Sequence, residues 1–277
     1  MRKSAIAILL PTLIACLVFA GQSEITPRDI LNRSLAAHGG EKLTQWNSLE
    51  IKGAVDMLDG ITFRGAFRLF AKSPGKIRVE RDLTVAQGGR YFYEDFLNNG
   101  IAWSRRNLVP ARGNLDDMNR WWNRCFGIAH YATKAESATR KEDAVVEWRE
   151  KADVQSTEYK IAASRPAYVI TAIIGGNSAD LYIDKETFYF LQEVAGRSKR
   201  LFWDFKKFGD VTWPTKVLDI TAGARSEQIT PFSYESVKYN VAMEDWLFTE
   251  DMPPASPDGW LHIPTSPGSP GRNRARS

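Results

Sequence analysis

Most of this chain repeats one pattern: short segments of alternating apolar and polar residues, separated by residues that favour tight turns. In the segment from Ile61 to Lys72, apolar side chains fall on one face, and Arg64, Arg68 and Lys72 fall on the other. A period of two residues is typical of β-strands with one buried face. Asp59-Gly60 and Asn99-Gly100 supply the positive φ angles that two-residue hairpins require. The sequence therefore predicts a mainly β protein built as an antiparallel meander.

The predicted strands cover residues 51–58, 61–72, 76–83, 91–93, 101–103, 168–174, 181–183, 188–194, 199–205, 211–221 and 228–241. A first helix is predicted behind Thr26, with Pro27 at its first position, and ends at Gly39-Gly40. A second helix begins behind Asn114. Its apolar stripe has three- and four-residue spacing and consists of Leu115, Met118, Trp121, Trp122, Cys125, Phe126 and Ala129. We interpret the heavily charged residues 134–151 as a solvated helix or a mobile connection.

The two ends of the chain differ from the body. Arg2 and Lys3 precede an apolar stretch that reaches Ala20, which predicts a signal peptide over residues 1–20. The residues ending at Cys16 also match a lipobox, but the chain stays apolar after Cys16, so we favour ordinary cleavage. Residues 21–254 are predicted to form one domain, and the Pro-, Ser-, Gly- and Arg-rich residues 255–277 a disordered tail. We therefore predict an exported, periplasmic protein, or an outer-membrane lipoprotein if Cys16 is lipidated.

Charge and cysteine content exclude some classes of protein. Without Arg2 and Lys3 the chain has 35 basic and 33 acidic residues, which gives nucleic-acid binding little support. After cleavage Cys125 is the single cysteine, so no intramolecular disulfide is predicted.

Residues with catalytic or metal-binding chemistry are scattered. His38, His130 and His262 have no second ligand at metal-binding spacing, so we predict no metal site and no cofactor. Cys125 falls on the apolar face of its helix, where cysteine behaves as a small hydrophobe. Tryptophans such as Trp103 and Trp213 fit a core better than a sugar- or base-stacking site. The sequence therefore predicts a protein that is not an enzyme.

Several short motifs occur in a characteristic order along the chain: Ala36-Ala37-His38-Gly39-Gly40, Lys52-Gly53, Ser73-Pro74-Gly75-Lys76-Ile77-Arg78, Leu181-Tyr182-Ile183-Asp184-Lys185-Glu186-Thr187, Val211-Thr212-Trp213-Pro214 and Trp246-Leu247-Phe248-Thr249. Over roughly residues 25 to 252 the chain resembles the LolA/LolB-like lipoprotein carrier superfamily. The resemblance implies a curved antiparallel sheet that forms an incomplete barrel, with helices covering its concave face over an apolar cavity. In the lipoprotein carriers an arginine that takes part in loading and release precedes the proline of the third-strand turn. Here that position is Ser73.

The resemblance also implies a periplasmic carrier of a lipid or lipoprotein acyl chain, with partners in the cell envelope and a place in outer-membrane lipoprotein sorting. The predicted cavity residues share the apolar face of the first strands: Phe63, Phe67, Leu69, Ile77 and Val79. The predicted lid is the helix bearing Trp121, Trp122 and Phe126.

Two other classes of function stay open. An envelope hydrolase or sugar-binding module would have a polar cleft containing a carboxylate with a raised pKa. A structural or partner-binding β domain would fill the same face with its own side chains.

Overall fold

The computed structural model describes residues 25–249 except 60, 86–87, 108, 152–158 and 224–226. The predicted signal peptide, Cys16, His262 and the predicted tail lie outside the described residues.

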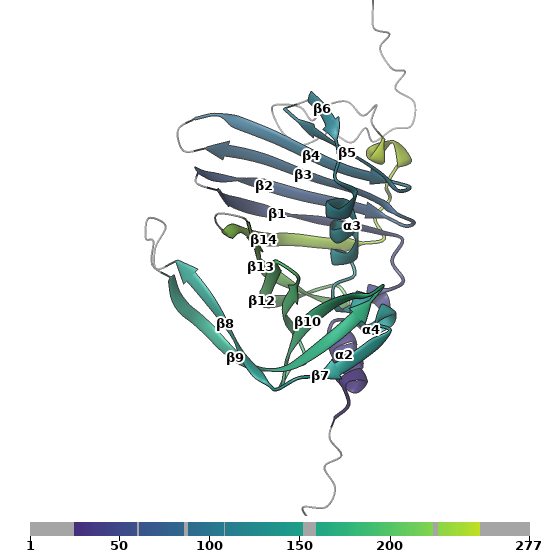
Figure 1. Ribbon diagram of the computed structural model, residues 1–277. Helices are drawn as coiled ribbons and strands as arrows, with labels where there is room; N and C mark the ends of the chain where they lie inside the picture. The colour runs from purple at the N-terminus through teal and green to yellow at the C-terminus, as the bar shows by residue number, and fades with distance from the viewer. Residues whose placement is uncertain are drawn as a thin grey trace, which may run out of the picture. The chain divides into compact units, whose positions relative to one another are not determined.

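The described chain is mainly β (Figure 1). Its helices are α2 (Pro27–Ala37), α3 (Leu115–Arg124) and α4 (Ile128–Lys134), and its 3-10 helices are η1 (Gly40–Leu43) and η2 (Asp245–Phe248). The strands are β1 (Ser48–Asp59), β2 (Ile61–Lys72), β3 (Lys76–Val85), β4 (Arg90–Asn98), β5 (Ile101–Arg106), β6 (Val109–Arg112), β7 (Ser137–Arg140), β8 (Ala144–Lys151), β9 (Tyr159–Ile174), β10 (Asn177–Asp184), β11 (Phe190–Ala195), β12 (Ser198–Phe208), β13 (Val211–Ala222) and β14 (Glu227–Tyr239).

These strands form one sheet in the order β6-β5-β4-β3-β2-β1-β14-β13-β12-β11-β10-β9-β7, and β8 pairs with β9. Neighbours such as β1 and β2, or β3 and β4, are antiparallel. Among the described strands, β6 and β7 are the two ends of this order and do not pair with each other, so the sheet is open. The prediction of a mainly β fold with an open antiparallel sheet is confirmed.

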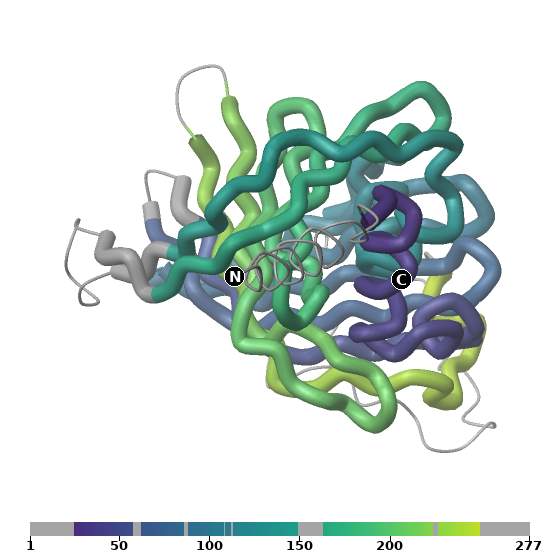
Figure 2. The backbone as a smooth tube through the Cα atoms, turned by 90° about the horizontal axis from the view of Figure 1, so that it is seen from below, coloured from purple at the N-terminus to yellow at the C-terminus, as the bar shows by residue number. Residues whose placement is uncertain are grey.

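The chain forms two compact units. The first comprises the chain up to Glu41 together with Ile128–Leu201, and the second comprises Lys42–Gly127 together with the chain from Phe202. In the second unit the last strand, β14, pairs with the first strand, β1, and Tyr239 lies opposite Leu49. Figure 2 allows these two segments to be followed by colour. The single domain over residues 21–254 stays a prediction.

Helix α2 of the first unit begins and ends as its sequence predicts. The Thr26 hydroxyl oxygen accepts a hydrogen bond from the backbone N–H of Asp29 at 3.1 Å, and Pro27 occupies the first helical position. Ile30 is fully buried on one face of the helix. His38 follows the last turn, is 4% exposed, and accepts a hydrogen bond at Nε2 from the backbone N–H of Phe190 at 3.0 Å. His38 therefore has a structural role at the end of α2.

The strands of both predicted hairpins pair, and the turn of the second is described. Asn99 and Gly100 have φ angles of 49° and 84° between β4 and β5, the left-handed values that a type I′ turn requires. Strands β1 and β2 pair up to Asp59 and Ile61, and Gly60 between them lies outside the described residues.

The interpretation of residues 134–151 was wrong. This segment contains the last residue of α4 and the strands β7 and β8, which both pair with β9. Along β8, Val145 and Glu147 are exposed and the alternate residues Val146 and Trp148 are buried. This two-residue period is that of a β-strand. The high density of charge concealed this alternation in the sequence.

The predicted second helix is two helices. Helix α3 ends at Arg124, and Gly127 has a φ of 52°, a left-handed value that ends the helical path before α4 begins at Ile128. Phe126, which we placed on the lid helix, lies in this turn and outside α3.

Candidate functional site

The candidate functional site is a cluster of aromatic side chains in the second unit, which we call the aromatic face. It consists of Phe67, Phe232 and Tyr234 of the sheet and Trp121 of α3. Phe67 is only 1% exposed. Its ring centroid lies 5.1 Å from that of Phe232, 5.9 Å from that of Tyr234 and 5.7 Å from that of Trp121. These distances are typical of packed aromatic pairs. Helix α3 therefore covers this part of the sheet.

Few interactions hold α3 in this place. Its N-terminus is capped by Asn114, whose side-chain oxygen accepts hydrogen bonds from the backbone N–H groups of Asp116 and Asp117. Near its C-terminus, Arg124 Nη1 lies 3.0 Å from Oδ2 of Asp219 on β13, and its guanidinium lies 4.6 Å from the centroid of the Trp121 ring. Burial raises the pKa of Asp219, and the nearby Arg124 opposes that shift. Within α3 only Met118 is fully buried.

A second aromatic cluster adjoins the C-terminal end of α3. The Trp46 ring centroid lies 4.9 Å from that of Phe126 and 5.6 Å from that of Trp122. Cys125 between them is 1% exposed, and burial raises the pKa of its thiol. The reactive thiolate is therefore disfavoured, and Cys125 is a small buried hydrophobe, as the sequence predicts.

The structure gathers only some of the predicted site residues. Phe67, Leu69, Ile77 and Val79 are at most 2% exposed, and Phe67 meets Trp121 as the lid prediction requires. Phe63 is partly exposed and packs edge-on against Tyr91. Trp122 and Phe126 contact Trp46, a residue that we did not single out because it lies outside every periodic segment. That the predicted residues of the first strands line a cavity, and that the helix bearing Trp121 and Trp122 is its lid, remains a prediction.

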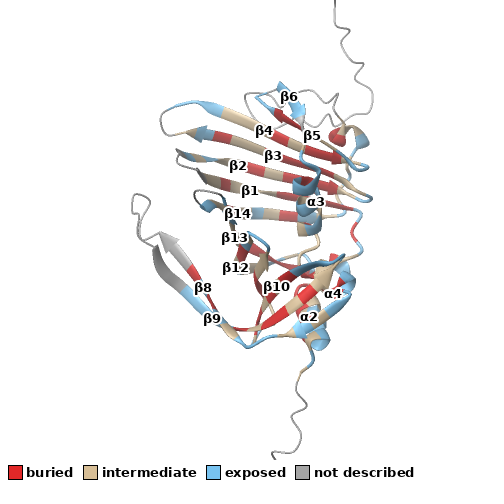
Figure 3. Ribbon diagram, in the orientation of Figure 1, coloured by how far each residue is buried: buried red, intermediate tan, exposed pale blue. Residues whose placement is uncertain are grey.

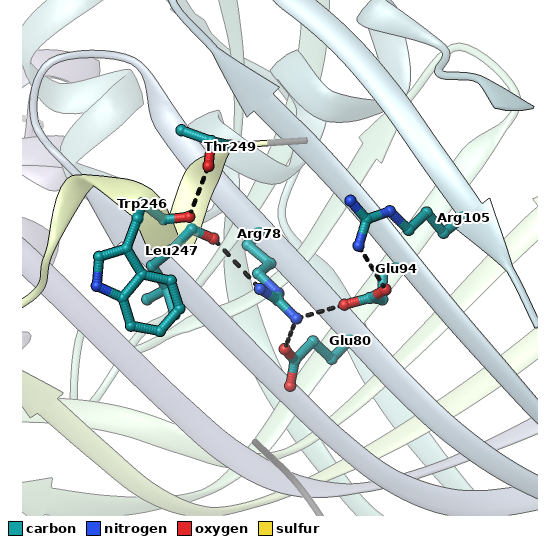
Figure 4. Close-up of polar contacts among 7 residues, drawn as sticks. All are labelled: Arg78, Glu80, Glu94, Arg105, Trp246, Leu247 and Thr249. Atoms are coloured by element: carbon teal, nitrogen blue, oxygen red, sulfur yellow. Dashed lines mark hydrogen bonds and ion pairs between the residues drawn. The ribbon is translucent and has the colours of Figure 1, made fainter. Parts of the chain in front are cut away.

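The opposite face of the same sheet contains a buried charged cluster that we did not predict (Figure 4). Arg78 and Glu80 on β3 and Glu94 on β4 have fully buried side chains. Arg78 Nη2 lies 2.5 Å from Glu80 Oε1 and also contacts Glu94 Oε1. Arg105 Nη1 on β5 lies 4.0 Å from Glu94 Oε2. The four side chains form a chain of alternating positive and negative groups inside the protein.

The same cluster holds the last described segment of the chain. Arg78 Nη1 donates a hydrogen bond to the carbonyl oxygen of Leu247 in η2 at 3.3 Å. The Thr249 hydroxyl donates to the carbonyl of Trp246 at 2.9 Å and closes that turn. Leu247 and Phe248 pack with Phe70 in a buried apolar cluster. Figure 3 shows buried residues along the strands β1 to β4. On β3 four consecutive residues are buried, so both faces of this strand are covered.

Burial sets the electrostatics of this cluster. Loss of water raises the pKa of Glu80 to about 7, with Arg78 opposing the shift, and also raises the pKa of Glu94. The Arg78 and Arg105 guanidinium carbons lie 5.0 and 5.6 Å from the centroid of the Phe96 ring. A hydrolase would need such a carboxylate in a polar cleft, whereas Glu80 and Glu94 are 0% exposed and do not meet a substrate from solution.

The described residues contain no group of three or more His, Cys, Asp or Glu side chains placed to bind a metal ion. None of the helices among them combines the length and apolar character that crossing a membrane requires.

Comparison with known proteins gives the following. No family model and no curated protein matches this sequence. A LolA superfamily protein from Nitrosomonas europaea matches with a TM-score of 0.49 and 12% identity, over 82% of this chain and 99% of that one. A DUF1329 family protein from Desulfovibrio piger gives 0.44 and 11% over 82% and 98%. An outer membrane lipoprotein-sorting protein domain from Vibrio parahaemolyticus gives 0.44 and 9% over 80% and 95%.

These three matches each cover 80% or more of this chain, at 12% sequence identity or less.

Proposed function

We propose that this protein is a periplasmic carrier that binds the acyl chain of a lipid or lipoprotein on the aromatic face, with α3 as the displaceable cover. The observation that carries the proposal is the packing of Trp121 of α3 onto Phe67 and Phe232, with Tyr234 beside both of these rings. Displacing α3 would uncover a continuous apolar and aromatic surface, which suits a flexible hydrocarbon chain and needs no specific polar contact.

The magnitudes favour such an exchange. An acyl chain of about 15 methylenes gains about 12 kcal/mol when it leaves water, at roughly 0.8 kcal/mol for each methylene. Uncovering Met118 and Trp121 costs about 2–3 kcal/mol for each side chain. Separating Arg124 from the buried Asp219 costs about 3–5 kcal/mol more, and the sum of these losses stays below the gain from the acyl chain.

The predicted signal peptide supports a place in the periplasm, and the resemblance to lipoprotein carriers supports transfer between envelope partners. The most specific role that this resemblance supports is outer-membrane lipoprotein sorting.

A structural β domain is the second candidate, and one observation favours it. Phe67, Leu69, Ile77 and Val79 are buried, so the protein's own side chains fill this face of the sheet. The two candidates differ in whether an acyl chain can displace α3.

The substitution Phe67→Ala tests the proposal. We expect it to weaken binding of a fluorescent fatty-acid probe by about 1–3 kcal/mol, roughly 5- to 150-fold, because it removes apolar contact with the ligand. Probe fluorescence titration gives the affinity, and circular dichroism verifies that the variant is folded. Phe70→Ala is the matched control, because Phe70 is equally buried but packs against Leu247 and Phe248 on the opposite face.

The control variant should bind the probe as wild type does. If wild-type protein shows no saturable binding, or if folded Phe67→Ala binds equally well, the aromatic face is structural and the carrier proposal is wrong.

A further inference from the structure

The last described residues of the chain lie against strands β2, β3 and β4. The Ser48 hydroxyl fixes the chain just after β14, because it donates a hydrogen bond to the carbonyl of Val241 at 2.6 Å. Beyond this point are residues 242–249, which we call the strap. The strap contains the single turn of η2 and no strand. It is therefore a short element that stays in place through its own contacts with the sheet.

The contacts of the first half of the strap are at the surface. Lys72 Nζ donates a hydrogen bond to the carbonyl of Met243 at 2.7 Å, and the Asp245 carboxylate pairs with Lys72 and Lys76. The Asp245 side chain is 65% exposed, and such exposed ion pairs contribute little stability. The second half must therefore provide most of the interactions that keep the strap closed.

The second half of the strap reaches the buried charged cluster (Figure 4). Leu247 is buried, and its carbonyl accepts the hydrogen bond from Arg78 Nη1. The other terminal nitrogen of this guanidinium, Nη2, contacts Glu80 and Glu94. One arginine side chain therefore joins the strap to both buried carboxyl groups.

The two carboxyl groups lie where ionisation of both is unfavourable. Glu80 and Glu94 are directly opposite each other on β3 and β4, and both side chains are 0% exposed. Oε2 of each is inaccessible to solvent and has no hydrogen-bond partner among the described residues. Two like charges that share one site without water repel each other. A proton on one of the two carboxyl groups removes this repulsion while the strap is closed.

Other charged groups reduce the repulsion but do not cancel it. Arg68 on β2 lies opposite Glu80 in the strand register, and Arg105 on β5 lies 4.0 Å from Glu94. Further charged groups around the pair are Glu50 and Lys52 on β1, Asp95 on β4, and Lys72, Lys76 and Asp245 at the strap. Even with these groups present, burial raises the pKa of Glu80 to about 7 and also raises that of Glu94.

Opening of the strap returns water to the cluster. In the closed state Glu80 keeps its proton up to about pH 7, whereas a hydrated glutamate loses it near pH 4.5. The state that binds the proton more tightly is favoured in acid. The closed state therefore has its full advantage below pH 4.5 and loses it as the pH rises through about 7.

We propose that the strap is a pH-sensitive switch, which is closed in acid and opens as the pH rises through neutrality, while the sheet beneath it stays folded. The strap packs on Phe70, on the face of the sheet opposite to Phe67 and the aromatic face. This inference therefore goes beyond the proposed function and does not depend on it.

Hydrogen–deuterium exchange of the full mature chain between pH 5 and 8 tests the proposal. The backbone N–H groups of Leu247 and Thr249 are hydrogen-bonded within the strap, so their exchange reports its opening. After correction for intrinsic exchange rates, we expect their protection factors to fall about 70-fold over this range, from the pKa change of Glu80. At every pH they should stay at least about tenfold below those of β2, because the strap opens without unfolding of the sheet.

Glu80→Gln removes the titrating group and keeps the shape of the side chain. The protection of the strap should then change less than about threefold between pH 5 and 8. Glu235→Gln is the matched control, because Glu235 is an exposed glutamate on β14, and it should keep the wild-type response. Circular dichroism at pH 5 verifies folding. If Glu80→Gln does not fold, Glu94→Gln replaces it and should move the fall in protection to lower pH, since the facing charge is gone.

Two results would overturn the proposal. One is a pH response of the strap that Glu80→Gln, or Glu94→Gln in its place, leaves unchanged. The other is equal protection of the strap and β2 at every pH, which would show that the strap opens only when the sheet unfolds. Neither measurement involves a ligand, so failure of the switch leaves the carrier proposal standing.

Discussion

We expect the substitution Arg78→Met to lower the free energy of unfolding by about 3–5 kcal/mol. Arg78 lies between Glu80 and Glu94, all three side chains are 0% exposed, and the two carboxylates face each other on paired strands. Removing the guanidinium leaves two buried acidic groups without their shared cation, which is far more costly than losing a surface ion pair. Denaturant unfolding at pH 7 measures the change.

Two comparisons make this result specific. Arg64→Met breaks the largely exposed pair with Asp56 and should cost less than about 1 kcal/mol. Adding Glu80→Gln and Glu94→Gln to Arg78→Met should recover part of the stability, because the uncompensated charges are gone. A loss below 1 kcal/mol for Arg78→Met alone would show that the cluster contributes little to folding.

The second large effect is a dependence of stability on pH that Glu80→Gln removes. In the folded protein the pKa of Glu80 is raised from 4.5 to about 7, so the folded state binds a proton that the unfolded state has lost. The resulting stabilisation is fully present below pH 4.5 and is lost as the pH rises through about 7. Its size is about 3 kcal/mol, from a shift of roughly 2.5 pKa units.

Unfolding free energies of wild type and Glu80→Gln at several pH values between 4 and 8 test this. The wild-type value should fall with rising pH relative to that of the variant. Asp245 does not interfere, because its ion pairs with Lys72 and Lys76 lower its pKa to about 2, outside this window. Parallel pH profiles for the two proteins would mean that Glu80 keeps an ordinary pKa.

Local signals in the sequence predict the elements that depend on neighbouring residues. Asn99-Gly100 forms its hairpin because both positions tolerate left-handed φ angles, and Thr26 caps α2 through a hydrogen bond only three residues long. The apolar faces of the first strands follow from a two-residue period. These features need no knowledge of distant contacts.

The features that the sequence does not reveal depend on residues far apart in the chain. Arg78 and Glu80 alternate with Ile77 and Val79 in the pattern of a solvated face, and only the packing of η2, 169 positions away, shows that this face is covered. Trp46 and Trp213 lie on separate segments and approach the same turn only in the folded chain. The predicted apolar stripe continues past Gly127, but the left-handed φ angle of this glycine ends the helical path there, so one predicted helix is two.

The pairing of β1 with β14 has a consequence for how the protein is made. Ser48 donates a hydrogen bond to the carbonyl of Val241, 193 positions later, so the first strand of the second unit acquires its final neighbour only when the chain is nearly complete. Contacts between such distant segments form slowly, because a long loop must close before they contribute. During synthesis the first strands of the second unit therefore lack their final partner until β14 has been made.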